Sequence, residues 1–275
     1  MAEMPRAAAR GLLVAVLVAA CLTPAQAGAA AAGAAAPPPA GHVWRPAVQH
    51  AIAYALKRRG IKAFAVATRH RYWGWHDQQT FPSASVLKAM LLVAYLDRGS
   101  VRHRRLGRSD RALLDPMIRR SNNAAASTVM GIVGTGGLRA LANRTGMRRF
   151  TPVAGIWGNS RVDARDQARF FLRIQQFLPN RHRAYAMHLL ASVVPSQRWG
   201  FGQVKPRHWQ LYFKGGWGSG TGRVDHQVAL LQRGARRVGV AIMTSNDGSH
   251  AYGKATLRGI AALLLRGLSQ ATLVP

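Results

Sequence analysis

The pattern of apolar positions predicts a helix and two strands at the start of the folded chain. Between residues 46 and 58, apolar side chains recur at helical spacing, and Gly60 follows as a helix-terminating glycine. Residues 61–68 are almost continuously apolar, which is typical of a strand buried on both faces. A short second strand is expected at 71–76, where three aromatic residues would pack into the core.

The middle of the chain has the pattern of consecutive helices. An apolar run after Ser85 predicts a helix to about Asp97. Asp163 and Asp166 stand at the start of a later helix and are interpreted as structural capping residues. Residues 146–162 are expected to form a loop. The further helices of this region are expected at 110–118, 124–133, 138–145, 163–174 and 184–194.

The last third of the chain returns to strands. Residues 209–214 alternate as a strand, a glycine-rich turn is expected at 215–222, and strands at 227–231 and 238–243 complete a meander. An amphipathic pattern predicts a closing helix at 251–268. Strands and helices near both ends therefore flank an all-helical middle.

The N-terminus has the features of an export signal. Two arginines precede an apolar run at 11–20 that is too short to span a bilayer as a permanent helix. Small residues at positions 25 and 27 offer an ordinary cleavage site, which would make residues 1–27 a signal peptide. Residues 18–21 equally resemble a lipoprotein box, in which the signal ends before Cys21. We expect a secreted or extracytoplasmic protein, anchored by a lipid on Cys21 in the second case.

Cys21 is the only cysteine, which excludes an internal disulfide framework and a cysteine-based zinc site. Residues 28–41 consist of Ala, Gly and Pro without periodicity and are interpreted as a linker. The folded domain is then expected at 42–275.

The charge of the chain is strongly positive. It has 39 basic residues against 9 acidic ones, a formal charge of +30. Such a surface attracts polyanions. Outside the cell, anionic cell-wall polymers or a membrane surface are the expected partners, whereas nucleic acid is not expected. We expect a monomer.

The first candidate for chemistry is the Ser85-x-x-Lys88 spacing at a helix start. Residues three apart lie on one helical face, so the lysine amine can reach the serine hydroxyl. A serine hydroxyl is a poor nucleophile and needs such a base. The alternative interpretation is that Ser83 or Ser85 merely caps the helix and that Lys88 is a solvated side chain.

Two further motifs follow in order. Ser121-x-Asn123 lies in a connector between predicted helices, and Lys214, followed by two glycines, ends a predicted strand. With the Ser85 motif they match the set S-x-x-K, S-x-N and K-T-G of serine acyltransferases. Over about residues 45–270, the chain therefore resembles the penicillin-recognising serine hydrolases, on the class A β-lactamase-like and penicillin-binding-protein-like branch.

This resemblance implies a fold of the α/β (α+β) class. In the β-lactamase/transpeptidase-like fold, an antiparallel sheet is flanked by the N- and C-terminal helices. An all-helical lobe lies beside the sheet, and the active site lies between the two lobes.

The resemblance also assigns roles to residues. Ser85 would attack a carbonyl and form an acyl-enzyme, and Lys88 would take its proton if burial and the nearby Lys214 lower the pKa of Lys88. Ser121 would relay that proton to the leaving nitrogen. Lys214 completes the catalytic set.

The implied substrate-binding residues are Asn123, Gly216, Trp217 and Arg223. Asn123 would hold the substrate amide. The backbone N–H groups of Ser85 and Trp217 would form the oxyanion hole.

The chain departs from the family pattern around the substrate carboxylate. Gly215 replaces the hydroxyl residue of K-T-G, which weakens the usual contact to that carboxylate. Arg223 stands where class A enzymes carry a carboxylate-binding arginine and is expected either to compensate or to be one more arginine of a basic surface. Asn122 replaces the aspartate of S-D-N.

A second departure concerns hydrolysis of the acyl group. In class A enzymes, the loop corresponding to 146–162 supplies a glutamate that activates water. The only glutamate of this chain is Glu3, inside the export signal. Efficient hydrolysis of β-lactams is therefore not expected.

The leading hypothesis is an exported serine acyl-hydrolase or peptidase that acts on cell-wall peptide or a related amide through Ser85. No cofactor and no metal are expected, because the motifs of nucleotide-binding and zinc enzymes are absent from the sequence. One alternative is a β-lactamase with an atypical deacylation step. Another is a non-catalytic, basic protein that binds the cell wall.

Overall fold

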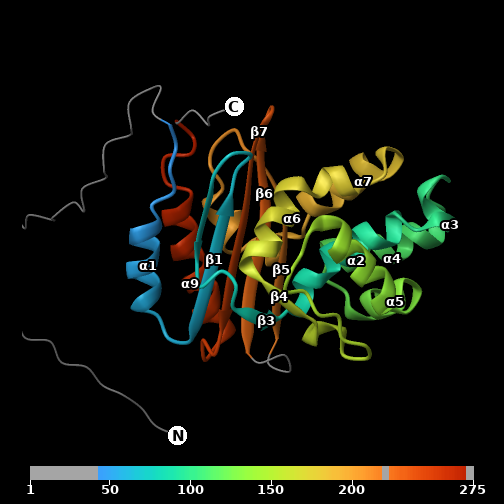
Figure 1. Cartoon of the computed structure of the whole chain (residues 1–275), viewed down its shortest axis with the longest axis horizontal. Coiled ribbons are helices and arrows are strands. Elements are labelled where there is room, and N and C mark those ends of the chain that lie inside the picture. Colours follow the sequence, from blue (N-terminus) through green and yellow to red (C-terminus); the bar gives the residue numbers. More distant parts are fainter. Residues whose placement is uncertain (1–42, 219–222, 271–275) are drawn as a thin grey trace, which may run out of the picture. The chain divides into compact units, whose positions relative to one another are not determined.

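A five-stranded antiparallel sheet, with strands in the order β2-β1-β7-β6-β5, forms the centre of the structure (Figure 1). β5 lies at one edge, so half of its backbone polar groups point away from the sheet. The strand bounds are β1 Ile61–Ala67, β2 Tyr72–Trp75, β5 Gln210–Gly218, β6 Val224–Arg233 and β7 Arg236–Ser245.

The computed structural model describes residues 43–218 and 223–270, which belong to one compact unit. The signal peptide and the linker predicted at 1–41 lie outside these residues, as does part of the turn predicted at 215–222. Within the described part of the chain, every helix is too short or too polar to cross a membrane.

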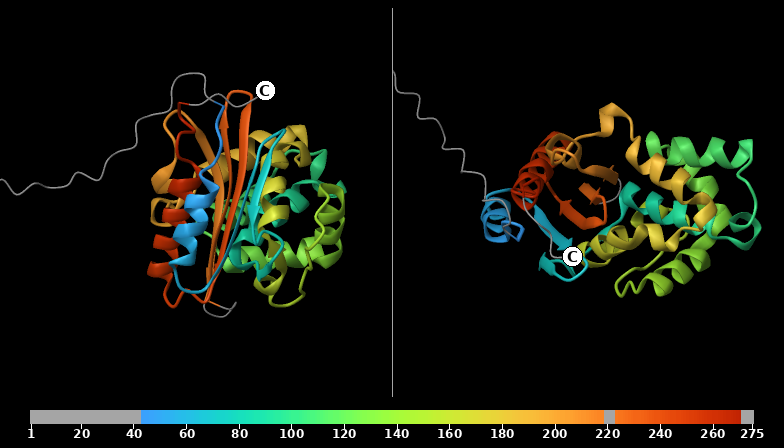
Figure 2. Two further views of the ribbon diagram at one scale, coloured as in Figure 1. Left: turned by 60° about the vertical axis from the view of Figure 1, so that its left-hand side comes forward. Right: turned by 90° about the horizontal axis from the view of Figure 1, so that it is seen from above.

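Helices cover both faces of the sheet. α1 (Val48–Leu56) and α9 (His250–Leu264) lie side by side on one face (Figure 2). α6 (Ala164–Phe177) covers the other face, where it packs against β7, β1 and β6. The sheet is therefore buried on both sides, as the apolar run at 61–68 predicted.

The side chains of β1 contribute to two hydrophobic cores, one on each face of the sheet. Successive side chains of a strand point to opposite faces. Ala63 and Ala65 pack into the core on the α6 side, whereas Phe64 and Val66 pack into the core on the α1 and α9 side. Small residues on the α6 side allow that helix to approach the sheet closely.

The remaining long helices form a lobe beside the sheet, as Figure 1 shows. α2 lies at its centre, because all of its residues are buried and α4, α5 and α7 pack against it. The bounds are α2 Leu87–Leu96, α3 Gly99–Arg102, α4 Arg108–Arg119, α5 Asn123–Thr145 and α7 Asn180–Ala191.

Short elements complete the fold. A two-stranded sheet of β3 (Thr80–Pro82) and β4 (Arg161–Asp163) joins the segment before α2 to the end of the loop predicted at 146–162. The others are the helical turns η1 Ala84–Val86, η2 Trp157–Asn159 and η3 Pro195–Gln197, and the short helix α8 Phe201–Val204.

Two of the boundaries that differ from the sequence-based expectation involve glycines. The helices predicted at 124–133 and 138–145 are both present in α5, with a kink between them at Gly134, where φ is +67°, and the second helix begins directly after that glycine instead of at Leu138. The glycine-rich turn was predicted from Gly215, but Gly215 to Gly218 continue β5 and pair with β6. The glycines here permit a close backbone approach that the next subsection describes.

We predict that Gly239→Ala destabilises the fold by about 1 to 3 kcal/mol. A Cβ at Gly239 of β7 would lie 2.1 Å from the backbone oxygen of Ala168, so α6 would have to move away from the sheet. Denaturant unfolding measures the change. Gly131→Ala is the control: Gly131 is an exposed α5 glycine with open space where a Cβ would lie, and this substitution should stabilise by about 0.5 to 1 kcal/mol. Equal effects of the two substitutions would contradict the prediction.

Candidate active site

Ser85 lies in the helical turn η1, directly before α2. Val86 and Leu87 also have helical backbone angles, so Ser85 and Lys88 belong to one continuous helical segment. Ser85 is only 8% exposed. The residue before it, Ala84, has φ of +43°, a strained value for a side chain with a Cβ. Packing therefore holds the turn in a conformation that the local sequence does not favour.

The capping interpretation of the serines is wrong. Neither η1 nor α2 has a side-chain cap. Ser83 instead donates its hydroxyl to the backbone oxygens of Ala84 and Gly158, each at 3.3 Å, and its N–H donates to Ser160 O at 2.7 Å. Ser83 thus fastens the η2 region to the turn that carries Ser85.

Lys88 is fully buried and points at the connector between α4 and α5. Its Nζ donates to Ser121 O at 2.5 Å, to Ser121 Oγ at 3.1 Å and to Asn123 Oδ1 at 2.7 Å. The interpretation of Lys88 as a solvated side chain is therefore wrong. The first two predicted motifs meet in this cluster.

Lys214 reaches the same hydroxyl from the sheet side. It is fully buried on β5, and its Nζ lies 2.9 Å from Ser121 Oγ and 2.7 Å from Gly215 O. The Ser121 hydroxyl therefore lies between two lysine nitrogens. Within the described residues, no carboxylate contacts either nitrogen.

The backbone at Ser121 places this hydroxyl. Its φ is +57°, in the left-handed region that serine rarely adopts. The next residue, Asn122, caps α5 by accepting a hydrogen bond from Ala125 N at 2.8 Å, as the cap-forming residues of the connector predicted. The cap fixes the start of α5, and the strained residue before it turns its side chain toward the lysines.

Burial changes the protonation of both lysines. It lowers the pKa of Lys88 to about 7. Burial, and after it the charge of Lys88, lowers the pKa of Lys214 well below the usual value. Burial thus explains the predicted lowering of the Lys88 pKa. The charge of the neighbouring lysine instead lowers the pKa of Lys214. A lysine with a pKa near 7 can act as a base at neutral pH.

The strand β5 comes close to Ser85. A Cβ at Gly216 would lie 2.9 Å from Ser85 N and 2.8 Å from Val86 N. Only glycine permits this approach of β5 to η1. Within the described residues, no hydrogen bond joins Ser85 Oγ to Lys88. Catalytic hydrogen bonds of this kind often tighten only when substrate binds.

Trp157 of η2 is a site residue that the sequence did not identify. Its ring centroid lies 5.0 Å from Lys88 Nζ, and its Nε1 donates to Ser127 Oγ at 3.0 Å. The Trp157 indole therefore covers Lys88. It comes from the loop that corresponds to the glutamate-bearing loop of class A enzymes. The surrounding Trp-Gly-Asn-Ser stretch is polar, but only the packing of η2 on η1 and the hydrogen bond to Ser127 place the ring.

The two aspartates after this loop are structural, as expected. Asp163 accepts a hydrogen bond from Asp166 N at 2.7 Å and caps α6. The capping box is incomplete, since the Asp166 carboxylate accepts from the N–H groups of Arg148 and Arg149. Burial raises the pKa of Asp163 to about 7.

Beyond Lys214, the end of β5 is aromatic. A Cβ at Gly215 would lie 3.0 Å from Cζ2 of Trp199, so the indole adjoins the space of the missing hydroxyl residue. Trp217 packs edge-on against Trp199 and stacks on His250, with ring centroids 5.9 and 5.4 Å apart. Sequence motifs could not reveal this cluster, because its three rings come from distant segments.

A cavity of about 430 Å³ adjoins this aromatic cluster, and its lining includes Trp217, Arg223 and Asp225. Arg223 is exposed and has φ of +51°. Asp225 lies 2.5 Å from His250 Nδ1 and is almost completely buried, which raises its pKa to about 7. No group of three or more His, Cys, Asp or Glu side chains in the described residues could hold a metal ion.

Class A β-lactamases have the same fold. The β-lactamase from Sphaerobacter thermophilus is similar with a TM-score of 0.70 and 17% identity, over 80% of this chain and 96% of that chain. The class A β-lactamase from Mycobacterium abscessus has a TM-score of 0.68 and 15% identity, over 81% and 99%. A class A representative from Bacteroides cellulosilyticus has a TM-score of 0.67 and 13% identity, over 82% and 99%.

Sequence comparison gives the family. The model of the beta-lactamase enzyme family matches residues 107–268, whereas no curated protein sequence matches the chain. The chain therefore belongs to the beta-lactamase enzyme family and is a serine hydrolase with the class A β-lactamase-like fold. The matched residues include Ser121 and Lys214. Ser85 and Lys88 precede them, so their roles rest on the motif and on the contacts described above.

We predict that the rate of acylation by a penicillin rises with pH through an apparent pKa near 7. Lys88, whose pKa is lowered to about 7, is protonated below that pH and cannot accept the Ser85 proton, so the rate should fall about tenfold per pH unit on the acid side. Stopped-flow measurement of the acylation rate at a series of pH values gives the acid side of this pH–rate profile.

Trp157→Ala is the companion variant. Removing the indole admits water to Lys88, which should return its pKa toward the usual higher value and move the acid side of the profile to higher pH. A rate that does not change between about pH 5 and about pH 9 in the wild type would contradict the role of Lys88.

Proposed function

We propose that this protein is an exported serine acyl-hydrolase or peptidase that acts on cell-wall peptide or a related amide through an acyl-enzyme on Ser85. The observation that carries the proposal is the Ser121 hydroxyl, held at 3.1 Å from Lys88 Nζ and 2.9 Å from Lys214 Nζ. The sequence pattern of the N-terminus supports export, with or without a lipid on Cys21.

The lysines define a path for one proton. Neutral Lys88 takes the proton of Ser85 while Ser85 Oγ forms a bond to the substrate carbonyl carbon. The proton then passes through Ser121 to the leaving nitrogen as the carbon–nitrogen bond breaks. Lys214 orients the Ser121 hydroxyl and adds no net proton. The products of this step are an ester on Ser85 and a free amine.

Backbone groups stabilise the charge that develops on the carbonyl oxygen. The proposed donors are the N–H groups of Ser85 and Trp217. The support for this pair is the close approach of β5 to η1 at Gly216 and the position of β5 at the sheet edge. Asn123 would hold the substrate amide through its side chain, which already contacts Lys88.

Several features favour a peptide over a penicillin as the physiological substrate. The hydroxyl that would bind a penicillin carboxylate is absent at Gly215, and Trp199 adjoins that position. Arg223 lines the neighbouring cavity and could bind a carboxylate there, but Asp225 in the same lining opposes an anion. The loop at 146–162, which supplies a glutamate in class A enzymes, instead places Trp157 over Lys88, and an indole cannot activate water for deacylation.

The intact mass of the protein after incubation with benzylpenicillin tests the proposal. We predict one covalent adduct on the wild type, because the lysine pair activates Ser85, and no adduct on Ser85→Ala. Ser109→Ala, which removes an exposed α4 hydroxyl, is the control and should acylate normally. An adduct that survives Ser85→Ala would refute the proposal. A wild type that no acylating probe modifies, yet binds purified cell wall, would favour the non-catalytic alternative.

Family membership favours a second candidate, a β-lactamase with an atypical deacylation step. Nitrocefin separates the two candidates. Sustained turnover indicates a β-lactamase, and a single burst indicates an enzyme that acylates and then stalls.

We predict that the double variant Trp199→Ala/Gly215→Thr is acylated by benzylpenicillin about tenfold or more faster than Trp199→Ala alone. The threonine restores the hydroxyl that binds carboxylate, and the smaller residue 199 removes the 3.0 Å clash with its Cβ. Acylation rate constants over penicillin concentration measure the effect. Equal rates for the two variants would mean that Gly215 does not limit carboxylate binding.

A further inference from the structure

The acidic residues of this protein leave little negative charge on its surface. Of the aspartates in the described residues, Asp110, Asp163, Asp166, Asp225 and Asp247 are at most 5% exposed. The others, Asp77, Asp97 and Asp115, each form an ion pair with arginine. The exposed arginines are therefore hardly neutralised, and any surface that gathers them in a concave site can attract an anion.

Two adjoining cavities in the helical lobe gather such arginines. One has a volume of about 480 Å³ and the other about 240 Å³, and they share Asp97 and Arg144. We define the arginine track as the basic residues that line these two cavities: Arg98, Arg102, His103, Arg144, Arg181 and Arg183. Asp97 is the single acidic residue of this lining, and it pairs with Arg144 at 2.5 Å and with Arg102 at 3.8 Å.

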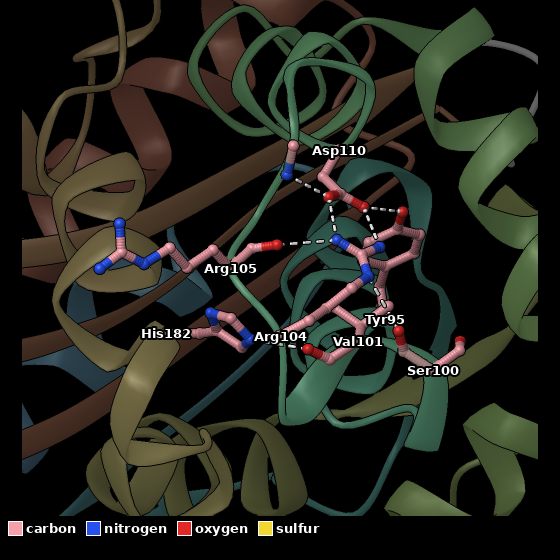
Figure 3. A network of polar contacts seen from close by, with 8 residues as sticks. Tyr95, Ser100, Val101, Arg104, Arg105, Asp110 and His182 are labelled. Atoms are coloured by element: carbon pink, nitrogen blue, oxygen red, sulfur yellow. Dashed lines mark hydrogen bonds and ion pairs between the residues drawn. The ribbon is translucent and has the colours of Figure 1, made fainter.

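The two walls of the larger cavity are fixed to each other. His182 of α7 is 2% exposed, and its Nε2 lies 3.0 Å from the backbone oxygen of Val101 in α3. Figure 3 shows this ring pointing at Val101. Arg181 and Arg183 flank the histidine, and Arg102 follows Val101. This one contact therefore brings the cations of α7 and α3 to the same cavity.

A second network holds the α3 side. Asp110 accepts hydrogen bonds from Tyr95 at 2.7 Å, from Arg104 at 2.6 and 2.9 Å and from Gly107 N at 2.7 Å (Figure 3). The Arg104 hydrogen bond and the other donors hold the pKa of this carboxyl far below its usual value. The segment that carries Arg102 and His103 is thus ordered before any ligand arrives, which lowers the entropic cost of binding.

We propose that the arginine track binds a phosphodiester-linked polymer that lacks bases. Guanidinium groups around a cavity suit a phosphate, which they can bind in a bidentate manner. Two adjoining cavities suit consecutive phosphates of a chain. A flexible polymer can follow the lining from one cavity to the next, which a flat membrane surface cannot do.

The aromatic residues of this region argue against single-stranded nucleic acid. Base stacking needs an open ring face. Phe177, the aromatic residue in the lining of the larger cavity, is 7% exposed, has the Arg173 guanidinium 5.2 Å from its ring centroid and stacks on Phe170. The cavity therefore offers charge and hydrogen-bond donors without a stacking platform.

The track is separate from the lysine cluster. Lys88 lies at the start of α2 and Asp97 directly after its end, which places them roughly 14 Å apart along the helix axis. A bound polymer would leave the Ser85 site accessible and would hold the enzyme on the wall. The proposal does not depend on the chemistry of Ser85.

The test measures binding of synthetic oligo(glycerol phosphate) to the full-length chain by titration calorimetry at several salt concentrations. The double variant Arg102→Gln/Arg181→Gln removes two exposed charges from the track. Arg207→Gln/Arg236→Gln removes two exposed charges elsewhere and matches it in net charge. We expect the track variant to bind at least about tenfold more weakly and with a shallower salt dependence, and the control to change less than about twofold.

Equal weakening of the two variants would overturn the proposal, because charge alone would then explain binding. Single-stranded DNA and phosphatidylglycerol vesicles are further probes. The proposal would also be overturned if either of them bound as tightly as oligo(glycerol phosphate) and its binding depended on the arginine track. Both variants should keep the unfolding temperature and the penicillin adduct of the wild type. Their retention shows that a loss of binding does not come from misfolding, and it separates this proposal from that for Ser85.

Discussion

The burial of two lysines around one serine hydroxyl is the constraint on which the rest of this structure depends. In a buried cluster where no carboxylate of the described residues contacts the amines, two ammonium groups cannot both remain charged at low cost. Lys88 comes from α2, Lys214 from the edge strand β5 and Ser121 from the connector between α4 and α5. The sheet, the central helix of the lobe and the α5 cap must therefore all be in place before the amines lose their water. The fold supplies the base that the sequence alone could only suggest.

Two of the residues with a strained backbone belong to the same constraint, whereas others, such as His76 and Asn246, lie elsewhere in the described residues. Ala84 and Ser121 both have positive φ, and β5 meets η1 where only a glycine fits. Ala84 and Ser121 are unfavourable locally, and the surrounding packing holds them. This part of the backbone strain lies at the turn that carries Ser85 and at the shared Ser121 hydroxyl, where chain geometry sets the contacts of the lysines. The helices and strands that provide the packing follow ordinary hydrophobic patterns.

Local patterns predicted the parts of the molecule whose structure is set by near neighbours. The apolar run of β1, the helix after Ser85, the Asn122 connector and the capping role of Asp163 all follow from residues a few positions apart. The ordered motifs also indicated the family. The continuation of β5 through Gly218 could not be predicted, because it depends on pairing with β6. Trp157 and Trp199 were missed for the same reason, since their positions over Lys88 and beside Gly215 come from packing between distant segments.

The complete burial of α2 has a consequence for how this enzyme can lose activity. Many active sites lie on segments that open locally at a low free energy while the core stays intact. Here the helix that carries Lys88 is the interior of the lobe, with no face in contact with solvent. Its hydrogen bonds can break only together with those of its neighbours, so amide exchange along α2 should follow global unfolding. The Lys88 amine then remains in place until the whole lobe unfolds, and loss of the lysine cluster on heating becomes one cooperative event.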